Sequence, residues 1–203
     1  MTTPREIELF YDIGSPYSYL AATQVEAIER TTSAQVRLKP FLLGAVFKAT
    51  GNTPPAGVAN KAKWMLADLA EWASAYGVPF RFPSRFPLNT LLTERALTAA
   101  ERTVGEGPAR RLALALFTAY WVDDRDVSDR QVIADVATAL GIDASAVLAA
   151  ADAQETKDLL RARTEDAVAR GAFGAPTFFV GDRMYWGNDR IVLLERLFAS
   201  AKL

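Results

Sequence analysis

Hydrophobic and polar positions along the chain change their period twice, and these changes separate a mixed start, a long helical middle and a strand-rich end. Residues 5 to 12 alternate weakly between polar and apolar side chains and predict a buried strand, and residues 15 to about 30 predict a helix. Residues 35 to 40 alternate polar and apolar side chains and stop at Pro40, which predicts a second strand. The start of the chain therefore predicts a β-α-β unit.

The middle of the chain predicts helices joined by loops. Residues 44 to 59 contain the breaker Gly51-Asn52-Thr53-Pro54-Pro55 and predict a loop, which precedes a helix around residues 59 to 76 and a second loop over residues 78 to 87. Farther on, Ser128-x-x-Gln131 predicts a capping box before a helix whose apolar stripe holds Val132, Ile133, Val136, Ala137 and Leu140. Asp152-x-x-Glu155 predicts the cap of the next helix, whose buried side holds Leu159, Leu160, Ala167 and Val168.

After Gly171 the pattern changes from a helical period to that of strands. Residues 177 to 180 and 183 to 186 flank the dipeptide Gly181-Asp182, which predicts a hairpin. Asn188 and Asp189 then predict the cap of a last helix, whose apolar face holds Ile191, Leu194, Leu197 and Phe198. The predicted order of elements is β-α-β, a helical block, and β-β-α.

Composition and charge restrict the class of protein. The 203 residues carry a net charge of −1, and acidic and basic side chains are interspersed, so the electrostatic signature of a nucleic-acid-binding protein is missing. The first six residues lack the pattern of a secretory signal, and no apolar run reaches membrane-spanning length. We therefore expect a cytoplasmic protein with no nucleic-acid or membrane partner.

The chain contains no histidine and no cysteine. This excludes a Ser-His-Asp triad, a thiol nucleophile, an ordinary zinc site and a histidine-ligated haem. An all-carboxylate metal site at Asp123-Asp124-Arg125-Asp126 is an alternative, but an acidic turn between two helices has the same sequence, and we predict no metal. The reactive group of an enzyme with this composition is expected to come from a cofactor.

The tetrapeptide Ser15-Pro16-Tyr17-Ser18 directly follows the first predicted strand. It stands where a thioredoxin-type fold carries its redox Cys-x-x-Cys. Ser15 suits an N-cap and Pro16 a first helical residue. A hydroxyl there cannot form a disulfide, but it can donate a hydrogen bond to the thiolate of a bound thiol, at a helix end that favours negative charge. Ser15 is thus either a plain cap or the donor to a thiol such as glutathione.

Five further segments accompany this tetrapeptide in order: Phe10-Tyr11-Asp12 before it, Lys39-Pro40-Phe41-Leu42-Leu43-Gly44, Gly51-Asn52-x-Pro54-Pro55, Gly171-x-Phe173-Gly174-Ala175-Pro176-Thr177, and Trp186-Gly187-Asn188-Asp189-Arg190. With them the chain resembles, over essentially its whole length, the 2-hydroxychromene-2-carboxylate isomerases. These are relatives of the kappa-class glutathione transferases in the DsbA-like thioredoxin branch. The resemblance implies an α/β thioredoxin-like domain (residues 1 to 43 and 172 to 203) split by an inserted helical domain (residues 44 to 171).

The resemblance also implies a function and a cofactor site. It implies glutathione-dependent cis-trans isomerisation between 2-hydroxychromene-2-carboxylate and trans-o-hydroxybenzylidenepyruvate in aromatic hydrocarbon catabolism, by reversible conjugate addition of a thiolate that the catalytic Ser15 stabilises. Ala175-Pro176 matches a cis-proline turn that pairs with the cysteinyl backbone of glutathione. The full set of implied glutathione-binding residues is Ser15, Pro16, Tyr17, Asn52, Lys61, Ala175, Pro176, Asn188 and Asp189.

For the aromatic carboxylate substrate, the resemblance implies binding by Lys48, Asn89 and Thr90. Arg81 and Arg85 are alternative partners for its carboxylate, and Trp64, Trp72, Phe82 and Phe86 are either an apolar slot for the ring or ordinary core residues. Two other functions stay open, namely a kappa-class-like transferase acting on another electrophile and a non-catalytic glutathione-binding module. The family also implies a homodimer.

Overall fold

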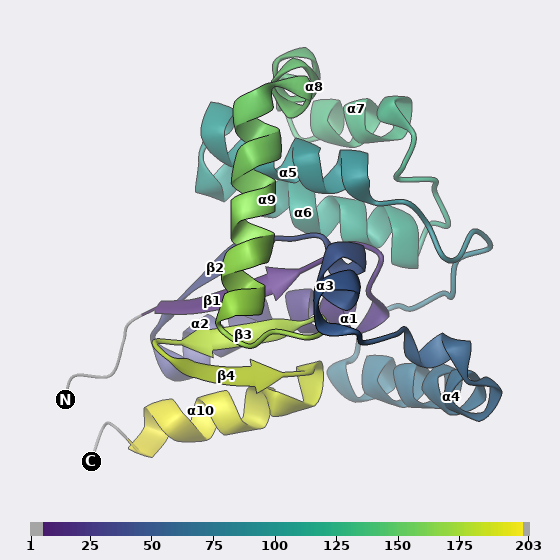
Figure 1. The fold of residues 1–203 in the computed structure, drawn as a ribbon, viewed down its shortest axis with the longest axis vertical. Helices are drawn as coiled ribbons and strands as arrows, with labels where there is room; N and C mark the ends of the chain where they lie inside the picture. Colours follow the sequence, from purple (N-terminus) through teal and green to yellow (C-terminus); the bar gives the residue numbers. More distant parts are fainter. Residues whose placement is uncertain (1–5, 201–203) are drawn as a thin grey trace.

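The computed structural model describes residues 6 to 200, and its centre is a four-stranded sheet in the order β2-β1-β3-β4 (Figure 1). The strands are β1 (Glu6–Tyr11), β2 (Gln35–Pro40), β3 (Thr177–Val180) and β4 (Arg183–Trp186). β1 pairs with β2 in parallel and with β3 in antiparallel register, with Leu9 opposite Phe178, and β3 pairs with β4 as a hairpin. The sheet therefore joins the first and last parts of the chain.

Helices cover both faces of this sheet. On one face, α1 (Pro16–Thr23), α2 (Val25–Thr32) and α10 (Ile191–Ser200) pack on Ile7, Leu9 and Phe178. On the other face, α3 (Leu43–Thr50) and α9 (Gln154–Ala169) pack on Phe10 and Phe179. The alternation of Leu9 and Phe10 between the two faces follows from the two-residue period of a strand.

A helical block lies between β2 and β3 in the sequence. Besides α3 and α9 it contains the 3-10 turn η1 (Pro55–Gly57), α4 (Ala59–Tyr76), α5 (Leu91–Val104), α6 (Glu106–Trp121), α7 (Arg130–Ala139) and α8 (Ala144–Asp152). Its core includes Phe117, Tyr120 and Trp121 of α6, and it continues to Tyr11 and Ile13 at the end of β1. The block thus packs directly against the loop that leads into α1.

The four predicted strands, the hairpin and the helix over residues 59 to 76 are confirmed. The single helix predicted for residues 15 to 30 is wrong in one respect, because it is broken at Gln24 into α1 and α2. The Thr23 hydroxyl donates to the Leu20 carbonyl at 2.6 Å, and the Gln24 N–H bonds the Ala21 carbonyl instead of that of Leu20. Such competition by a threonine side chain bends a helix.

The loop predicted for residues 44 to 59 is wrong over its first part, which is α3. Its start is held by tertiary contacts, since the Leu43 N–H donates to Asp12 at 2.9 Å and the Leu42 N–H to the Thr164 hydroxyl at 3.1 Å. These acceptors replace a local cap, so no cap residue marks the start of the helix in the sequence. Gly51, with a φ of 70°, ends it as the breaker predicts.

Three predicted caps also differ. Asp129, not Ser128, caps α7 and accepts from the Gln131 N–H at 2.8 Å, while Ser128 donates to Asp126. Asp152 ends α8 and pairs with Arg130, so α9 begins without a side-chain cap. The chain enters α10 through the 3-10 turn η2 (Asn188–Arg190), in which Asn188 is buried instead of capping.

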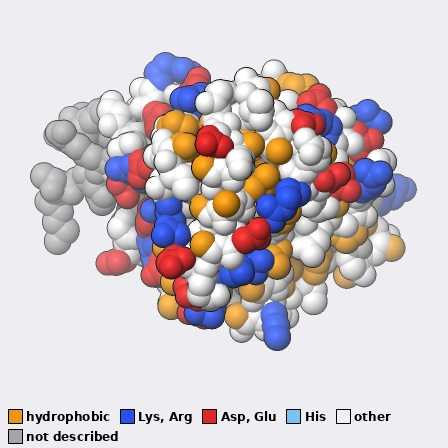
Figure 2. Space-filling model, turned by 90° about the horizontal axis from the view of Figure 1, so that it is seen from above, with side chains coloured by type: hydrophobic (Ala, Val, Ile, Leu, Met, Phe, Trp, Pro, Cys, Tyr) orange, Lys and Arg blue, Asp and Glu red, His pale blue; other side chains and the backbone are white. Residues whose placement is uncertain are grey.

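The predicted fold class is confirmed, with the helices α3 to α9 between the two halves of the sheet. The exact division into residues 1 to 43 with 172 to 203, and 44 to 171, stays a prediction. Seen from above in Figure 2, positive and negative side chains are intermingled over the face shown. Within residues 6 to 200, no helix is both long and apolar enough to cross a membrane.

Candidate active site

Ser15 caps the helix α1 at the point where β1 leads into it. Its backbone is extended, its hydroxyl oxygen accepts from the Ser18 N–H at 3.2 Å, and Pro16 occupies the first turn. The hydroxyl donates to the Ala175 carbonyl at 3.1 Å, which joins residues 160 positions apart. The N-cap pattern in the sequence is therefore realised, and it lies against the loop that precedes β3.

That loop is a tight turn with a cis peptide bond between Ala175 and Pro176. The Pro176 carbonyl accepts from the Gly187 N–H at 3.0 Å, so the loop is fastened to the end of β4. A Cβ atom on Gly174 would lie 2.5 Å from Nε1 of Trp186, which is too close for any other residue. The turn and the indole are thus packed as one unit beside Ser15.

The groups at this junction fit a bound thiolate and a peptide backbone. Within the described residues, neither the Tyr17 N–H nor the Ala175 N–H has a hydrogen-bond partner, and Pro16 has no N–H. The first turn of α1 therefore presents an unused donor beside the Ser15 hydroxyl, at the positive end of the helix dipole. Ser18 is fully buried, and its hydroxyl has no partner among residues 6 to 200.

Asp68 of α4 is a member of the site that the sequence analysis missed. Its carboxylate accepts from the Tyr17 hydroxyl at 2.7 Å. Burial raises the pKa of Tyr17, and the charges of Asp68 and Asp189 raise it further, so the phenol stays neutral between two acids. Asp68 follows the buried Met65 by one helical turn, and only this helical spacing hints that it faces inward.

Asn188 and Asp189, two of the implied glutathione-binding residues, lie in the turn η2 beside α1. Asn188 is 2% exposed. Its side-chain amide donates to the Tyr76 hydroxyl at 3.4 Å, and its backbone carbonyl accepts from that hydroxyl at 3.2 Å. Asp189 is partly exposed and pairs with Arg190 at 3.0 Å. Of the two side chains, only that of Asp189 is therefore partly exposed, and an ammonium group can reach its carboxylate.

Asn52 and Lys61, the other implied glutathione contacts, lie on the segment from α3 to α4. Asn52 donates through its amide to the Phe173 carbonyl at 2.8 Å, which places it beside the cis-proline loop. Lys61 is exposed in the first turn of α4, a helix whose N-cap Val58 makes no side-chain hydrogen bond. A lysine next to free helical N–H groups suits a carboxylate.

The three candidate cations for the substrate carboxylate differ in their partners. Arg81 pairs with Asp124 at 3.1 Å, and Arg85 with Asp126 at 3.6 Å. Lys48, in the last turn of α3, is exposed and has no ion-pair partner among residues 6 to 200. Lys48 is accordingly available to an external anion, whereas the arginines neutralise the acidic turn.

Asn89 and Thr90, the other implied substrate contacts, lead into α5. Asn89 accepts from the Leu91 N–H at 3.1 Å. Thr90 is 8% exposed, and its hydroxyl donates to Asp12 at 2.8 Å. The hydroxyl of Thr90 is thus engaged within the protein, and Asn89 is the more accessible of the two.

The aromatic residues considered for a substrate slot do not gather in one place. Phe82 and Phe86 contact each other and Trp121, with ring centroids 4.9 to 6.1 Å apart, at the edge of the helical core. Trp72 packs on Tyr76. Trp64 of α4 is 64% exposed and stands outside both clusters.

Two buried carboxyl groups lie behind the loop that carries Ser15; Asp12 was named above only as part of a family motif, and Glu94 was not singled out. Asp12 accepts from the Gly14 N–H at 2.9 Å, the Leu43 N–H at 2.9 Å and the Thr90 hydroxyl at 2.8 Å. Glu94 of α5 is fully buried and accepts from the Ile13 N–H at 2.7 Å. Burial raises the pKa of both carboxyls, more strongly for Glu94, whose pKa the charge of Asp12 raises further.

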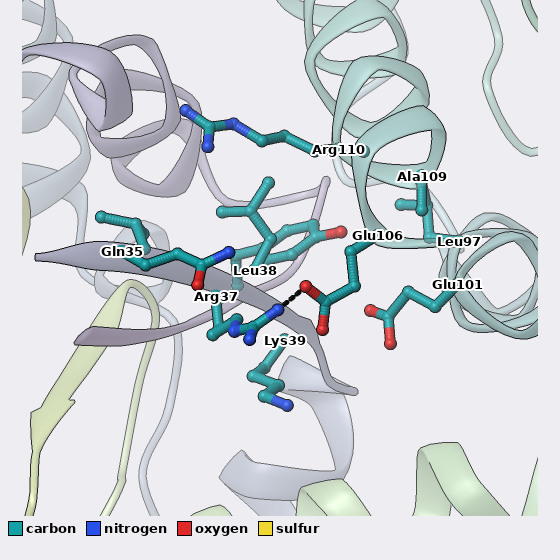
Figure 3. Close-up of a pocket in the computed structure, with 12 residues that line it drawn as sticks. Gln35, Arg37, Leu38, Lys39, Leu97, Glu101, Glu106, Ala109 and Arg110 are labelled. Atoms are coloured by element: carbon teal, nitrogen blue, oxygen red, sulfur yellow. Dashed lines mark ion pairs between the residues drawn. The ribbon is translucent and has the colours of Figure 1, made fainter. Parts of the chain in front are cut away.

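A separate hollow of about 150 Å³ lies along the outer edge of β2 (Figure 3). Arg37 and Glu106 form an ion pair across it, and Arg110 on its wall is paired with Glu29 at 2.9 Å. Its arginines are therefore neutralised from within the protein.

Among residues 6 to 200, no group of three or more acidic side chains is placed to hold a metal ion, and Asp124 is bonded to Ser84 and Arg81.

Comparison with known families agrees with this geometry. The model of the DsbA-like thioredoxin domain matches residues 6 to 199. A 2-hydroxychromene-2-carboxylate isomerase of Sphingobium xenophagum is 32% identical over 193 residues, which cover 94% of this chain and 96% of the relative. The chain belongs to the DsbA-like thioredoxin family. Within that family it stands with the 2-hydroxychromene-2-carboxylate isomerases and the kappa-class glutathione transferases.

Two further matches fix its place in the family. Glutathione S-transferase kappa 1 of Rattus norvegicus is 31% identical and covers 96% of this chain, with 91% of the relative matched. A solved structure of a 2-hydroxychromene-2-carboxylate isomerase superposes with a TM-score of 0.86 at 27% identity, over 96% of this chain and 95% of that one. These family members are isomerases and glutathione transferases, which share one fold but differ in reaction.

Proposed function

We propose that the protein is a glutathione-dependent isomerase that interconverts 2-hydroxychromene-2-carboxylate and trans-o-hydroxybenzylidenepyruvate. The observation that carries this proposal is the Ser15 hydroxyl, which caps α1 and lies 3.1 Å from the Ala175 carbonyl, in a chain without cysteine. A thioredoxin-type site with a hydroxyl in place of its thiol cannot exchange disulfides. It can hold a thiol brought in by glutathione, and the isomerase relatives match it over almost the whole chain.

Different residues around Ser15 bind different parts of glutathione. Bound glutathione would supply a thiolate that adds reversibly to the conjugated carbon of the substrate and leaves after the bond has rotated. Ser15 and the Tyr17 N–H donate to the sulfur, while the Ala175 backbone pairs with the cysteinyl residue. Asp189 binds the γ-glutamyl ammonium, and Lys61 binds the glycyl carboxylate.

Lys48 supplies the positive charge that the aromatic carboxylate substrate needs. It carries no internal ion pair among the described residues, in contrast to Arg81 and Arg85. A cation at this point also stabilises the negative charge that develops on the pyruvyl group during isomerisation. Asn89, which is exposed before α5, offers the substrate a neutral hydrogen-bonding partner.

The test is spectroscopic. The purified protein and glutathione are mixed with either isomer, and the approach to equilibrium is followed by ultraviolet absorbance. We expect a rate well above background that requires glutathione, with S-methylglutathione, which has no thiol, as the matched control. A rate that does not depend on the thiol would contradict the proposal.

A kappa-class-like transferase is the second candidate, because the rat kappa relative is nearly as similar as the isomerase. Conjugation consumes glutathione, whereas isomerisation returns it, so the free-thiol concentration after the reaction separates the two. Retention on immobilised glutathione without turnover of a chromene or an aryl halide would instead indicate a binding module. The proposal also includes a cytoplasmic location and a homodimer. Sedimentation of the purified protein tests the homodimer.

A further inference from the structure

Glu94 reaches from the helical block into the loop that carries Ser15. It sits on α5, 81 positions from its partner, and its Oε1 accepts from the Ile13 N–H at 2.7 Å. The Ile13 carbonyl in turn accepts from Nε1 of Trp121 at 2.8 Å, and the Asp12 carbonyl accepts from the Ser15 N–H at 2.9 Å. The helical block therefore holds both the N–H and the carbonyl of Ile13, which is two residues before Ser15.

The two buried carboxyls behind the loop have unequal hydrogen bonding. Asp12 accepts from three donors through its two oxygens, as an ionised carboxylate does. Glu94 is 0% exposed, accepts from one donor, and its Oε2 has no partner among residues 6 to 200. A buried charge with a bare oxygen costs far more than a neutral carboxyl in the same place, even though the proton of that carboxyl also lacks an acceptor among residues 6 to 200.

Among the described residues no cation offsets a charge on Glu94, since the one charge that shifts its pKa is that of Asp12, which raises it. The other ionisable groups nearby are the buried phenols of Tyr11 on β1 and Tyr120 on α6, and Arg163 of α9, which acts on Tyr11 and is paired with Glu101. Burial raises the pKa of both phenols, so they are neutral and cannot balance a second negative charge. Asp68 and Asp189 already add negative charge around Tyr17 of α1.

We propose that Glu94 is a neutral carboxylic acid and a positioning residue, which fixes the Ile13 peptide and thereby the Ser15 loop without placing another negative charge behind the thiol site. The positioning part rests on the proposed function, since it concerns the thiolate, but the neutral state does not. A glutamate that was ionised here would repel a thiolate at Ser15 and raise the pKa of the thiol. The proton on Glu94 removes that repulsion while the Oε1 contact remains.

The neutral state is tested without any ligand. Infrared difference spectra of the wild-type protein and Glu94→Gln at neutral pH should contain the carbonyl band of one protonated carboxyl, present in the wild type and absent in the variant. Glutamine keeps the size of the side chain and an oxygen for the Ile13 N–H. If the variant removes only the bands of an ionised carboxylate, the proposal is overturned, whatever the enzyme's activity.

The positioning role is tested with three variants. Glu94→Gln should leave the thiol titration of bound glutathione and kcat within about twofold of wild type, because no charge is lost. Glu94→Leu removes the contact and should lower kcat on the order of tenfold with little change in KM. Thr98→Val is the matched control, since Thr98 is equally buried one turn along α5 and donates only to the Glu94 carbonyl. It should leave kcat unchanged.

The possible results separate the two claims. Equal losses in Glu94→Gln and Glu94→Leu would show that the charge of Glu94 is needed and would overturn the neutral state. If Glu94→Leu does not fold, amide exchange at Ile13 in Glu94→Gln decides, because a held peptide keeps the slow exchange of the wild type and a released one exchanges faster. A failed isomerase assay with the carbonyl band present would overturn the proposed function and leave the neutral state standing.

Discussion

Replacing Ser15 with alanine removes two hydrogen bonds and separates the structural role of the residue from its chemical one. The hydroxyl accepts from the Ser18 N–H at 3.2 Å and donates to the Ala175 carbonyl at 3.1 Å. Loss of the N-cap alone should lower the free energy of unfolding by about 1 kcal/mol, within a range of roughly 0.5 to 2. Urea unfolding measures this part.

The chemical part follows from the single proton of the hydroxyl. To donate to a thiolate, Ser15 must release the Ala175 carbonyl, so it exchanges a neutral hydrogen bond for a charge-assisted one. The difference between the two kinds of bond is about 0.5 to 2 kcal/mol, and at about 1.36 kcal/mol per pKa unit it lowers the thiol pKa by roughly 0.4 to 1.5. Ser15→Ala should raise the pKa of the bound thiol by that amount.

The assay is the titration of the ultraviolet absorbance of the thiolate of bound glutathione, together with kcat/KM at a pH below the thiol pKa. Ser18→Ala is the near control, because the buried Ser18 hydroxyl has no partner among residues 6 to 200 and its removal should not lower stability. Asp143→Ala is the distant control, since it deletes the comparable cap of α8. The reasoning is refuted if Ser15→Ala loses stability as Asp143→Ala does but keeps the wild-type thiol pKa.

Four variants, one of them Glu94→Gln again, test the remaining parts of the site. Lys48→Met should raise the KM for the aromatic carboxylate on the order of tenfold, while Arg81→Met should change it little, and equal effects would reassign the anion site. Burial raises the pKa of Glu94 above the value of about 4.3 in an unfolded chain, so the folded protein binds the extra proton and its stability falls as pH rises from about 4.3 through the raised pKa. Glu94→Gln should therefore gain in unfolding free energy relative to wild type across that window, and a constant difference in urea unfolding would contradict the raised pKa. Gly174→Ala should destabilise by about 1 to 3 kcal/mol, because its Cβ would lie 2.5 Å from the Trp186 indole, and an unchanged urea midpoint would show that the loop yields freely.

Local signals in the sequence predicted the strands and the Ser15 cap because both depend on neighbouring residues. β1, β2 and the hairpin follow from alternation and a turn dipeptide, and Ser15 followed by Pro16 is a short-range pattern. The start of α3 was missed because its N–H groups are satisfied by Asp12 and Thr164, which are distant in sequence. Periodicity carries no information about such acceptors.

The same limit applies to the site. Asp68 and Glu94 were missed because each is defined by a contact across the fold, 51 and 81 positions from its partner. Their own neighbourhoods look like ordinary helix. The assignments of Lys48, Asn52, Lys61, Asn89 and the η2 residues came from family resemblance alone, and they stay predictions until a ligand complex or the variants above test them.

The bond between Ser15 and Ala175 sets an order of events during synthesis of the protein. Its two ends are 160 positions apart, and β1 lies between β2, made early, and β3, made near the end. Closing so long a loop costs entropy that no local contact repays, so the helical block can form on the ribosome well before the sheet is complete. Until β3 emerges, β1 has one open edge, and an unpaired strand edge favours aggregation. A chain cut short before β3 would keep Ser15 and Ala175 but lack the hairpin and the Gly187 N–H that fasten the cis-proline turn beside Ser15.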